Sequence, residues 1–172
     1  EVPGGDIRVL TMQGEQVARE VVGFNPSTQT GSLFFNSKNL STSTDTSYVI
    51  HYGNSSLTEP DPASQYGKYT IWNDYNAVWH MEENITSTAV EVKDSSTNRI
   101  DGTPNDASRF SARTGKVGRA IDFTKQNLSN AVIDVNNSIF DVTAGDTLYM
   151  KAWYRPEYDD LGNGNFLHRG PA

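Results

Sequence analysis

Short segments in which apolar and polar residues alternate run through the chain, and turn-forming residues stand beside them. Residues 6–11, 47–53 and 120–123 are examples. Such alternation places every second side chain on the same face, as a half-buried β-strand requires. Leu, Ala and Lys, which favour helices, are sparse. The pattern therefore predicts an all-β fold built from short strands.

Composition and charge narrow the class of protein. The chain has 172 residues, which is enough for one domain or two small ones. Only 35% of the residues are hydrophobic, and Ser, Thr, Asn, Asp and Gly fill much of the rest, which is typical of extracellular β-proteins with many turns. The formal net charge of -7 disfavours nucleic acid as a partner, because an acidic surface repels phosphate.

Two absences in the sequence exclude further classes. There is no cysteine, so a disulfide framework, a zinc thiolate site and a cysteine nucleophile are excluded. No apolar run reaches the roughly 18 residues that a membrane-spanning helix needs, so direct membrane insertion is not expected.

The chain divides into two predicted parts. Residues 1–69 predict a small antiparallel β domain, with a hairpin turn at 13–15 and a loop at 25–27. Residues 59–62 read Glu-Pro-Asp-Pro and form a short irregular connection, so the two parts are expected to pack together. Residues 70–172 predict further strands.

Within the second part, alternation favours strands at 107–113, 120–123 and 131–135, and most strongly at 148–154. Residues 94–102 predict a turn in which side chains bond their own backbone, and 138–140 a single helical turn.

Four ordered motifs in the second part carry a family resemblance. They are V-W-H-M-E-E at 78–83, D-S-S-T-N followed by G-T at 94–103, G-K-V-G-R-A-I-D-F at 115–123, and T-L-Y-M-K-A-W-Y-R-P at 147–156. This series resembles the opening half of a concanavalin A-like (laminin-G-like) lectin jelly roll. The resemblance implies a partial jelly-roll sandwich over 70–172, a binding module and not a catalyst, and more strands after Ala172.

The first part resembles a bacterial domain of unknown function. Asp-Ile-Arg at 6–8, Leu40 and Tyr-Gly-Asn at 52–54 match its pattern. That domain precedes concanavalin A-like domains in secreted or surface proteins, and it occurs in extracytoplasmic parts of TolQ/ExbB-type proton-channel proteins. The resemblance implies that N-terminal strands are missing before Glu1 and that the chain is a segment of a longer bacterial polypeptide.

Catalytic residues are not predicted. A glycosidase needs two carboxylates at a set separation, but Glu82 and Glu83 are adjacent and face opposite ways on a strand, as do Asp159 and Asp160. No histidine lies in a nucleophile motif. We therefore expect no enzyme activity.

The loop at 94–102 is the candidate metal site. Asp94, Asn98 and Asp101 offer the oxygen ligands that a structural calcium ion prefers. The alternative is a metal-free turn held by side-chain to backbone hydrogen bonds, and the sequence favours it, because Arg99 would put a positive charge beside the cation.

Aromatic and amide side chains are the candidate ligand contacts. Indole and phenol rings stack on sugar faces, and amides bind hydroxyl groups. Trp79 and Trp153 lie within predicted strands, so core packing is expected for both. The predicted ligand-binding residues are Trp72, which is also placed to cover the junction of the two parts, Tyr154, Tyr158, Asn163 and Asn165.

Together these features favour a non-catalytic binding or adhesion module for glycans or surface proteins, at the cell surface, secreted or in the periplasm. Neighbouring domains or subunits are expected as further partners. One alternative is a structural or assembly module of a surface appendage, virion or envelope complex. Another is an accessory module of a polysaccharide-degrading enzyme. Exposed Trp or Tyr beside polar loops would favour glycans, and an unpaired strand edge would favour assembly.

Overall fold

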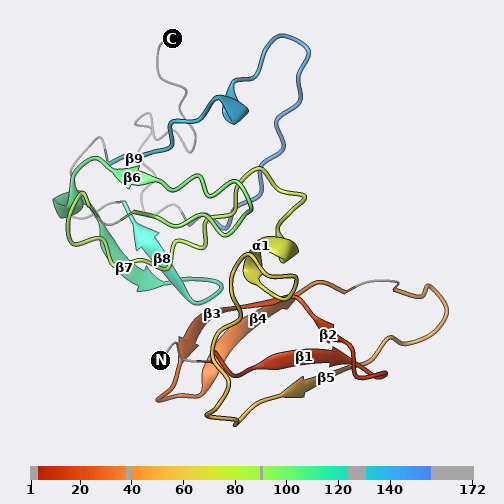
Figure 1. Cartoon of the computed structure of the whole chain (residues 1–172). Coiled ribbons are helices and arrows are strands. Elements are labelled where there is room, and N and C mark those ends of the chain that lie inside the picture. The colour runs from red at the N-terminus through yellow and green to blue at the C-terminus, as the bar shows by residue number, and fades with distance from the viewer. Residues whose placement is uncertain (1–3, 38–39, 90, 124–130, 156–172) are drawn as a thin grey trace.

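A computed structural model describes residues 4–37, 40–89, 91–123 and 131–155 (Figure 1). Strands in small antiparallel sheets dominate these residues and helix is scarce, so the all-β prediction is confirmed. The strands are β1 (Arg8–Thr11), β2 (Gln16–Val17), β3 (Arg19–Asn25), β4 (Thr30–Phe35), β5 (Tyr48–His51), β6 (Thr103–Pro104), β7 (Ser111–Thr114), β8 (Arg119–Asp122) and β9 (Ile133–Asp134). The helical segments are α1 (Lys68–Ile71) and the 3-10 turns η1 (Ala107–Arg109) and η3 (Ser138–Phe140).

β1 is the middle strand of a three-stranded sheet with the order β2-β1-β5. Val9 on β1 stands opposite Val17 on β2 and Ile50 on β5. Side chains directly opposite one another in a ladder share one face of the sheet. Val9 is fully buried, so these three residues form the inner face. Gly14, at φ +84°, lies in the turn between β1 and β2, at the predicted position.

β3 and β4 form a separate hairpin. The side chain of Asn25 accepts a hydrogen bond from the backbone N–H of Ser27 at 2.9 Å in the predicted loop. Phe35 packs on Tyr48 of β5, with ring centroids 4.9 Å apart, and Phe34 packs on Trp72 just after α1, at 5.4 Å. The hairpin therefore contacts both the first sheet and the segment that leads into the second part.

The second part contains the pairs β6-β9 and β7-β8. The backbone N–H of Gly115 donates to the carbonyl of Gly118 at 2.9 Å and closes the β7-β8 hairpin at the predicted tight connection. A small core of Ile85, Val92 and Phe110 lies beneath these strands. Six partly buried residues pack against it: Trp79, Met81, Ala107, Ile121, Ala131 and Ile133. The expected core role of Trp79 is confirmed.

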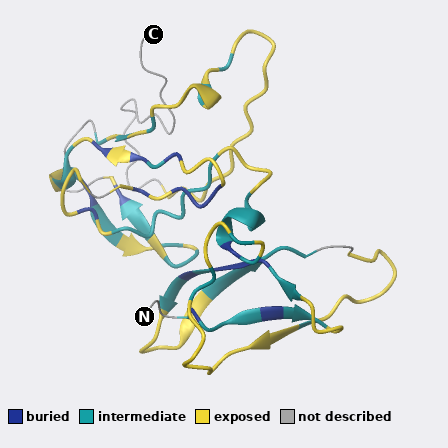
Figure 2. Cartoon of the chain, viewed as in Figure 1, coloured by how far each residue is buried: buried dark blue, intermediate teal, exposed yellow. Residues whose placement is uncertain are grey.

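The prediction of a strand at 148–154 is wrong. No strand forms there, and Figure 2 shows the segment that follows η3 as largely exposed. Tyr149 is 82% and Trp153 is 74% exposed, so the expected core role of Trp153 is wrong as well. A strand needs a ladder partner, and no described strand pairs with this segment, so its β-forming residues have no sheet to join.

Two smaller differences concern helical turns. The predicted strand at 107–113 begins as η1 and becomes extended only at β7. The helix α1 was not predicted, because four residues are too few to show a helical period and such a helix depends on tertiary packing.

Candidate functional site

A buried carboxylate lies where the two parts of the chain meet. Glu20 on β3 is 7% exposed. Its Oε2 accepts a hydrogen bond from Nε1 of Trp72 at 2.6 Å and lies 2.9 Å from Nε2 of His80. Its Oε1 accepts a hydrogen bond from Oγ of Ser95 at 2.7 Å, and Nζ of Lys68 is 4.0 Å away. Segments from both parts thus converge on one side chain.

Aromatic rings surround this carboxylate. The rings of Phe34, Trp72 and His80 contact one another at centroid distances of 5.4 to 5.8 Å, and Tyr75 packs edge-on against Trp72 at 5.6 Å. The indole N–H of Trp72 is already used by Glu20. Trp72 therefore covers the junction, and its predicted contact with a ligand stays a prediction.

The charge state of Glu20 follows from these contacts. Burial raises the pKa of Glu20, but hydrogen bonds and charge from His80 and hydrogen bonds from Trp72 and Ser95 outweigh burial, so the pKa is lowered overall. The carboxylate is therefore ionised at neutral pH. In a serine nucleophile site the imidazole stands between hydroxyl and carboxylate. Here the carboxylate lies between Ser95 and His80, so the order of the three groups differs from that of a serine nucleophile site. The contacts of Glu20 instead connect segments from the two parts of the chain.

Arg19, next to Glu20 in the sequence, forms an ion pair with the partly exposed Glu59. The guanidinium of Arg19 is fully buried, and its Nη1 donates to both carboxylate oxygens of Glu59 at 2.6 and 2.7 Å. Its other nitrogens donate to the carbonyl oxygens of Gly5 and Ile7 at 2.9 Å each. These bonds fix the start of the proline-containing connection against β3.

Asp94 organises the predicted turn at 94–102. One carboxylate oxygen accepts hydrogen bonds from the backbone N–H groups of Val78 and Ser96 at 2.8 and 2.7 Å. The other accepts from Oγ of Ser96 and the backbone N–H of Ile100 at 2.7 and 2.8 Å. Asp94 is 2% exposed, so four donors satisfy it without a metal ion.

The other two predicted metal ligands are also engaged. Asp101 accepts from the backbone N–H of Asp94 at 2.9 Å and pairs with Lys93 at 2.6 Å. Burial raises the pKa of Asp101, but these two contacts outweigh burial and lower it overall. The amide of Asn98 donates to the carbonyl of Asn76 at 2.9 Å. Within the described ranges, no three His, Asp or Glu side chains are grouped so that they could hold a metal ion.

The adjacent carboxylates at 82 and 83 contact different segments. Oε1 of Glu82 accepts a hydrogen bond from the backbone N–H of Arg119 at 2.8 Å, and the side chain lies against Gly118. Oε1 of Glu83 accepts from the backbone N–H of Lys93 at 2.9 Å. The two groups therefore serve separate backbone contacts.

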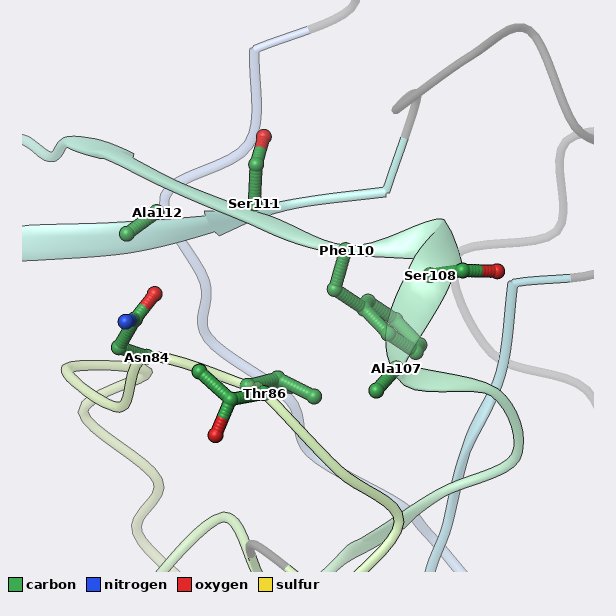
Figure 3. A pocket seen from close by; sticks show the side chains of 8 residues that line it. Asn84, Thr86, Ala107, Ser108, Phe110, Ser111 and Ala112 are labelled. Atoms are coloured by element: carbon green, nitrogen blue, oxygen red, sulfur yellow. The ribbon is translucent and has the colours of Figure 1, made fainter.

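A hollow of about 440 Å³ lies between the segment at 84–86 and the residues of η1 and β7 (Figure 3). Its floor includes the buried side chains of Ile85 and Phe110. Its polar groups are uncharged, and those of Asn84 and Thr86 make no hydrogen bond to any other described residue. Such a lining suits a small neutral polar group over an apolar floor.

The exposed aromatic residues near the end of the described chain form another candidate. Tyr149, Trp153 and Tyr154 are 82%, 74% and 68% exposed. Nζ of Lys116, in the β7-β8 turn, lies 5.8 Å from the centroid of the Trp153 ring. Tyr154 was predicted as a ligand contact. The other three predicted contacts, Tyr158, Asn163 and Asn165, lie outside the described residues.

Comparison with known proteins identifies no relative: no family model, no curated protein and no solved structure matches this chain. Over the described residues, no helix has the length and apolar character needed to cross a membrane.

Arg19 and Glu20, two neighbouring buried residues with separate partners, were not identified from the sequence. A usable signal was present, because two charged residues open a strand that is otherwise largely apolar. Charged residues are rarely buried unless they are paired. The side chains that hydrogen-bond to them, however, lie 40 to 75 residues away and could not be named from the sequence.

Proposed function

We propose that this chain is a non-catalytic binding or adhesion module for glycans or surface proteins, located outside the cytoplasm. The observation that carries the proposal is the exposure of Tyr149, Trp153 and Tyr154 on an extended segment. Large apolar groups that gather on a surface, unlike single exposed ones, mark sites of ligand or partner binding. An exposed indole or phenol ring offers an apolar face and a polar edge, which match the two sides of a sugar ring.

Two further features support a sugar as the ligand. Lys116 lies beside Trp153 and can donate hydrogen bonds to hydroxyl groups near the stacked ring. The hollow beside Asn84 adds neutral polar groups over an apolar floor. We include in the proposal that the second part is a concanavalin A-like jelly roll, on the strength of its motifs.

The non-catalytic character rests on how the carboxylates are used. Glu20, Asp94 and Glu82 each accept hydrogen bonds that hold the fold. Calcium at Asp94 stays a proposal, with the metal-free turn favoured because its donors are already provided.

Glycan binding is tested by probing the whole chain on an array of neutral and acidic oligosaccharides. The variants are Trp153→Ala and Tyr149→Ala, and the matched control is Tyr52→Ala, which removes an equally exposed ring, 80% exposed, from the first part. We expect the first two to lose binding about tenfold or more and the control to retain it. Equal binding by all variants would refute the aromatic segment as the glycan site, and no binding by the wild-type chain would refute glycans as the ligand.

Asn84→Ala separates the two surfaces. If this variant alone loses affinity, the sugar binds in the hollow of Figure 3 and the aromatic segment is not the site.

A further inference from the structure

Positive charge is concentrated around the exposed aromatic residues, although the chain as a whole is acidic. The β7-β8 hairpin, residues 111–122, and the segment 147–155 together contain five Lys or Arg residues and one acidic residue, Asp122. Their net charge is +4, whereas the other residues of the chain together carry -11. Such an uneven distribution creates a local positive potential that attracts anions.

Lys116, Lys151 and Arg155 carry charges that no neighbouring carboxylate neutralises. Asp122 lies 2.7 Å from Nε of Arg113, so this acid already has a partner. Among the described residues, no carboxylate forms an ion pair with the other three cations, and all three are exposed. Their charge is therefore available to a ligand.

Cations and aromatic rings alternate along the end of the described chain. The backbone there contains no helix and no turn, and in an extended backbone side chains two positions apart share a face. Tyr149, Lys151, Trp153 and Arg155 therefore line the same face. Tyr149 and Trp153 are 82% and 74% exposed, whereas Met150 on the other face is 43% exposed. The more exposed face thus presents a ring, a cation, a ring and a cation in order.

Lys116 adds a charge from the β7-β8 hairpin. Its Nζ lies 5.8 Å from the centroid of the Trp153 ring, a distance at which a cation is attracted to an aromatic face. A sugar that stacks on the exposed part of this ring would carry its substituents close to Lys116. Positive charge from two separate segments therefore lies beside the same stacking ring.

We propose that this surface, made of Tyr149, Trp153, Lys116, Lys151 and Arg155, binds an acidic glycan whose sugars carry carboxylate or sulfate groups. The rings would stack on sugar faces, and the cations would pair with the acidic groups. The inference rests on the proposed glycan binding and names the chemical class of the sugar.

Charge spacing favours a glycan over a nucleic acid. A nucleic acid carries a phosphate on every nucleotide, so a strand that ran beyond this surface would meet the acidic remainder of the chain. Neutral sugars can separate the charged groups of a glycan, so its charge can be confined to the positive surface. Polyanions that are not sugars are therefore expected to bind more weakly.

Calorimetric titration of the whole chain with matched pairs of oligosaccharides tests the proposal. One pair is an oligogalacturonate and the same oligosaccharide with its carboxyl groups reduced to alcohols, which tests carboxylate. The other pair is a heparin fragment and its desulfated form, which tests sulfate. We expect the acidic member of at least one pair to bind about tenfold more tightly than its partner, with an affinity that falls as salt rises, because exposed ion pairs are screened.

Charge-removing variants show whether the named residues bind the acidic groups. Lys116→Gln and Lys151→Gln should each weaken binding of the acidic member about two- to fivefold and leave binding of its partner unchanged. Trp153→Ala should weaken binding of both members. Arg99→Gln, which removes one exposed positive charge from the turn at 94–102, is the matched control and should bind like the wild type.

The outcomes separate this inference from the proposed function. Equal affinity for both members of each pair, with Trp153→Ala still weakening binding, would overturn the acidic ligand and leave glycan binding intact. Lysine variants that bind as tightly as Arg99→Gln would overturn the assignment of these residues. Equally tight binding of single-stranded DNA or polyglutamate would overturn the glycan as the selected ligand. Binding of none of the oligosaccharides would overturn the inference together with the proposed function.

Discussion

Replacing Glu20 with alanine should loosen the joint between the two parts of the chain. The substitution removes the acceptor for Nε1 of Trp72 and Oγ of Ser95, and it removes the partner of His80. Ser95 is 3% exposed, so its hydroxyl has little access to replacement water. The substitution therefore lowers the free energy of unfolding mainly because buried hydrogen-bond donors, above all the hydroxyl of Ser95, are left without an acceptor.

The magnitude follows from the number of donors left behind. A buried donor without an acceptor costs about 1–3 kcal/mol, and water reaching Trp72 and His80 lowers the cost for those two. Removing the charge of Glu20 also removes the desolvation penalty of burying it, which partly offsets the loss of stability. We expect Glu20→Ala to lower the free energy of unfolding by about 3 kcal/mol, and Glu20→Gln by about 1–2 kcal/mol, because the amide keeps one acceptor oxygen.

Urea denaturation at pH 7, followed by far-UV circular dichroism and tryptophan fluorescence, measures these changes. Glu15→Ala is the control, because Glu15 is an exposed residue in the β1-β2 turn and should change stability by about 0.5 kcal/mol or less. A double-mutant cycle with Trp72→Phe isolates the bond to Nε1. If Glu20→Ala costs no more than Glu15→Ala, the hydrogen bonds to Glu20 do not hold the two parts together.

Three further changes test other contacts. Because its pKa is lowered in the folded chain, Glu20 contributes stability above its ordinary pKa of about 4.3 and loses this stability as pH falls through the lower folded value. Glu20→Gln should therefore flatten the loss of stability on acidification below about pH 5, followed by circular dichroism. Gly118→Ala should cost about 2–4 kcal/mol, because φ is +59° and the new methyl group would meet Glu82, whereas Gly14→Ala, at φ +84° with no atom nearby, should cost only about 1 kcal/mol in the same urea assay. Addition of about 5 mM calcium should leave the melting temperature within about 1 °C. A calcium-dependent rise that Asp94→Ala abolishes would instead favour the metal site.

Local features of the fold could be predicted from the sequence because their partners are close along the chain. The turn at 94–102 is an example, since Asp94 bonds groups two and six residues away. The tight connection at 115–118 is another. Side chains that bond their own backbone leave a compositional signal that a single sequence carries.

The motifs that carry the family resemblances could be found in the sequence, but the contacts that their residues make in the fold could not. The carboxylate of Asp6 accepts hydrogen bonds from the backbone N–H groups of Gly53 and Asn54, so the elements at 6–8 and 52–54 meet in space. Glu82 likewise meets Gly118 and the backbone of Arg119. These motif residues therefore stabilise contacts between distant segments of this chain.

The junction at Glu20 could not be predicted, because its hydrogen-bond partners come from positions 52 to 75 residues further along the chain. Alternation shows which side chains share a face of a strand, but it does not show which strand or loop covers that face. Whether Glu20 is buried depends on which distant segment covers its face of the strand.

The segments 47–53 and 148–154 show that an alternating pattern alone does not decide whether a strand forms. Both alternate and both contain β-branched or aromatic residues, yet only the first contains a strand. β5 forms because β1 offers it a ladder, and the later segment has no described strand beside it. A local pattern makes a segment able to pair, and the neighbour decides whether it does.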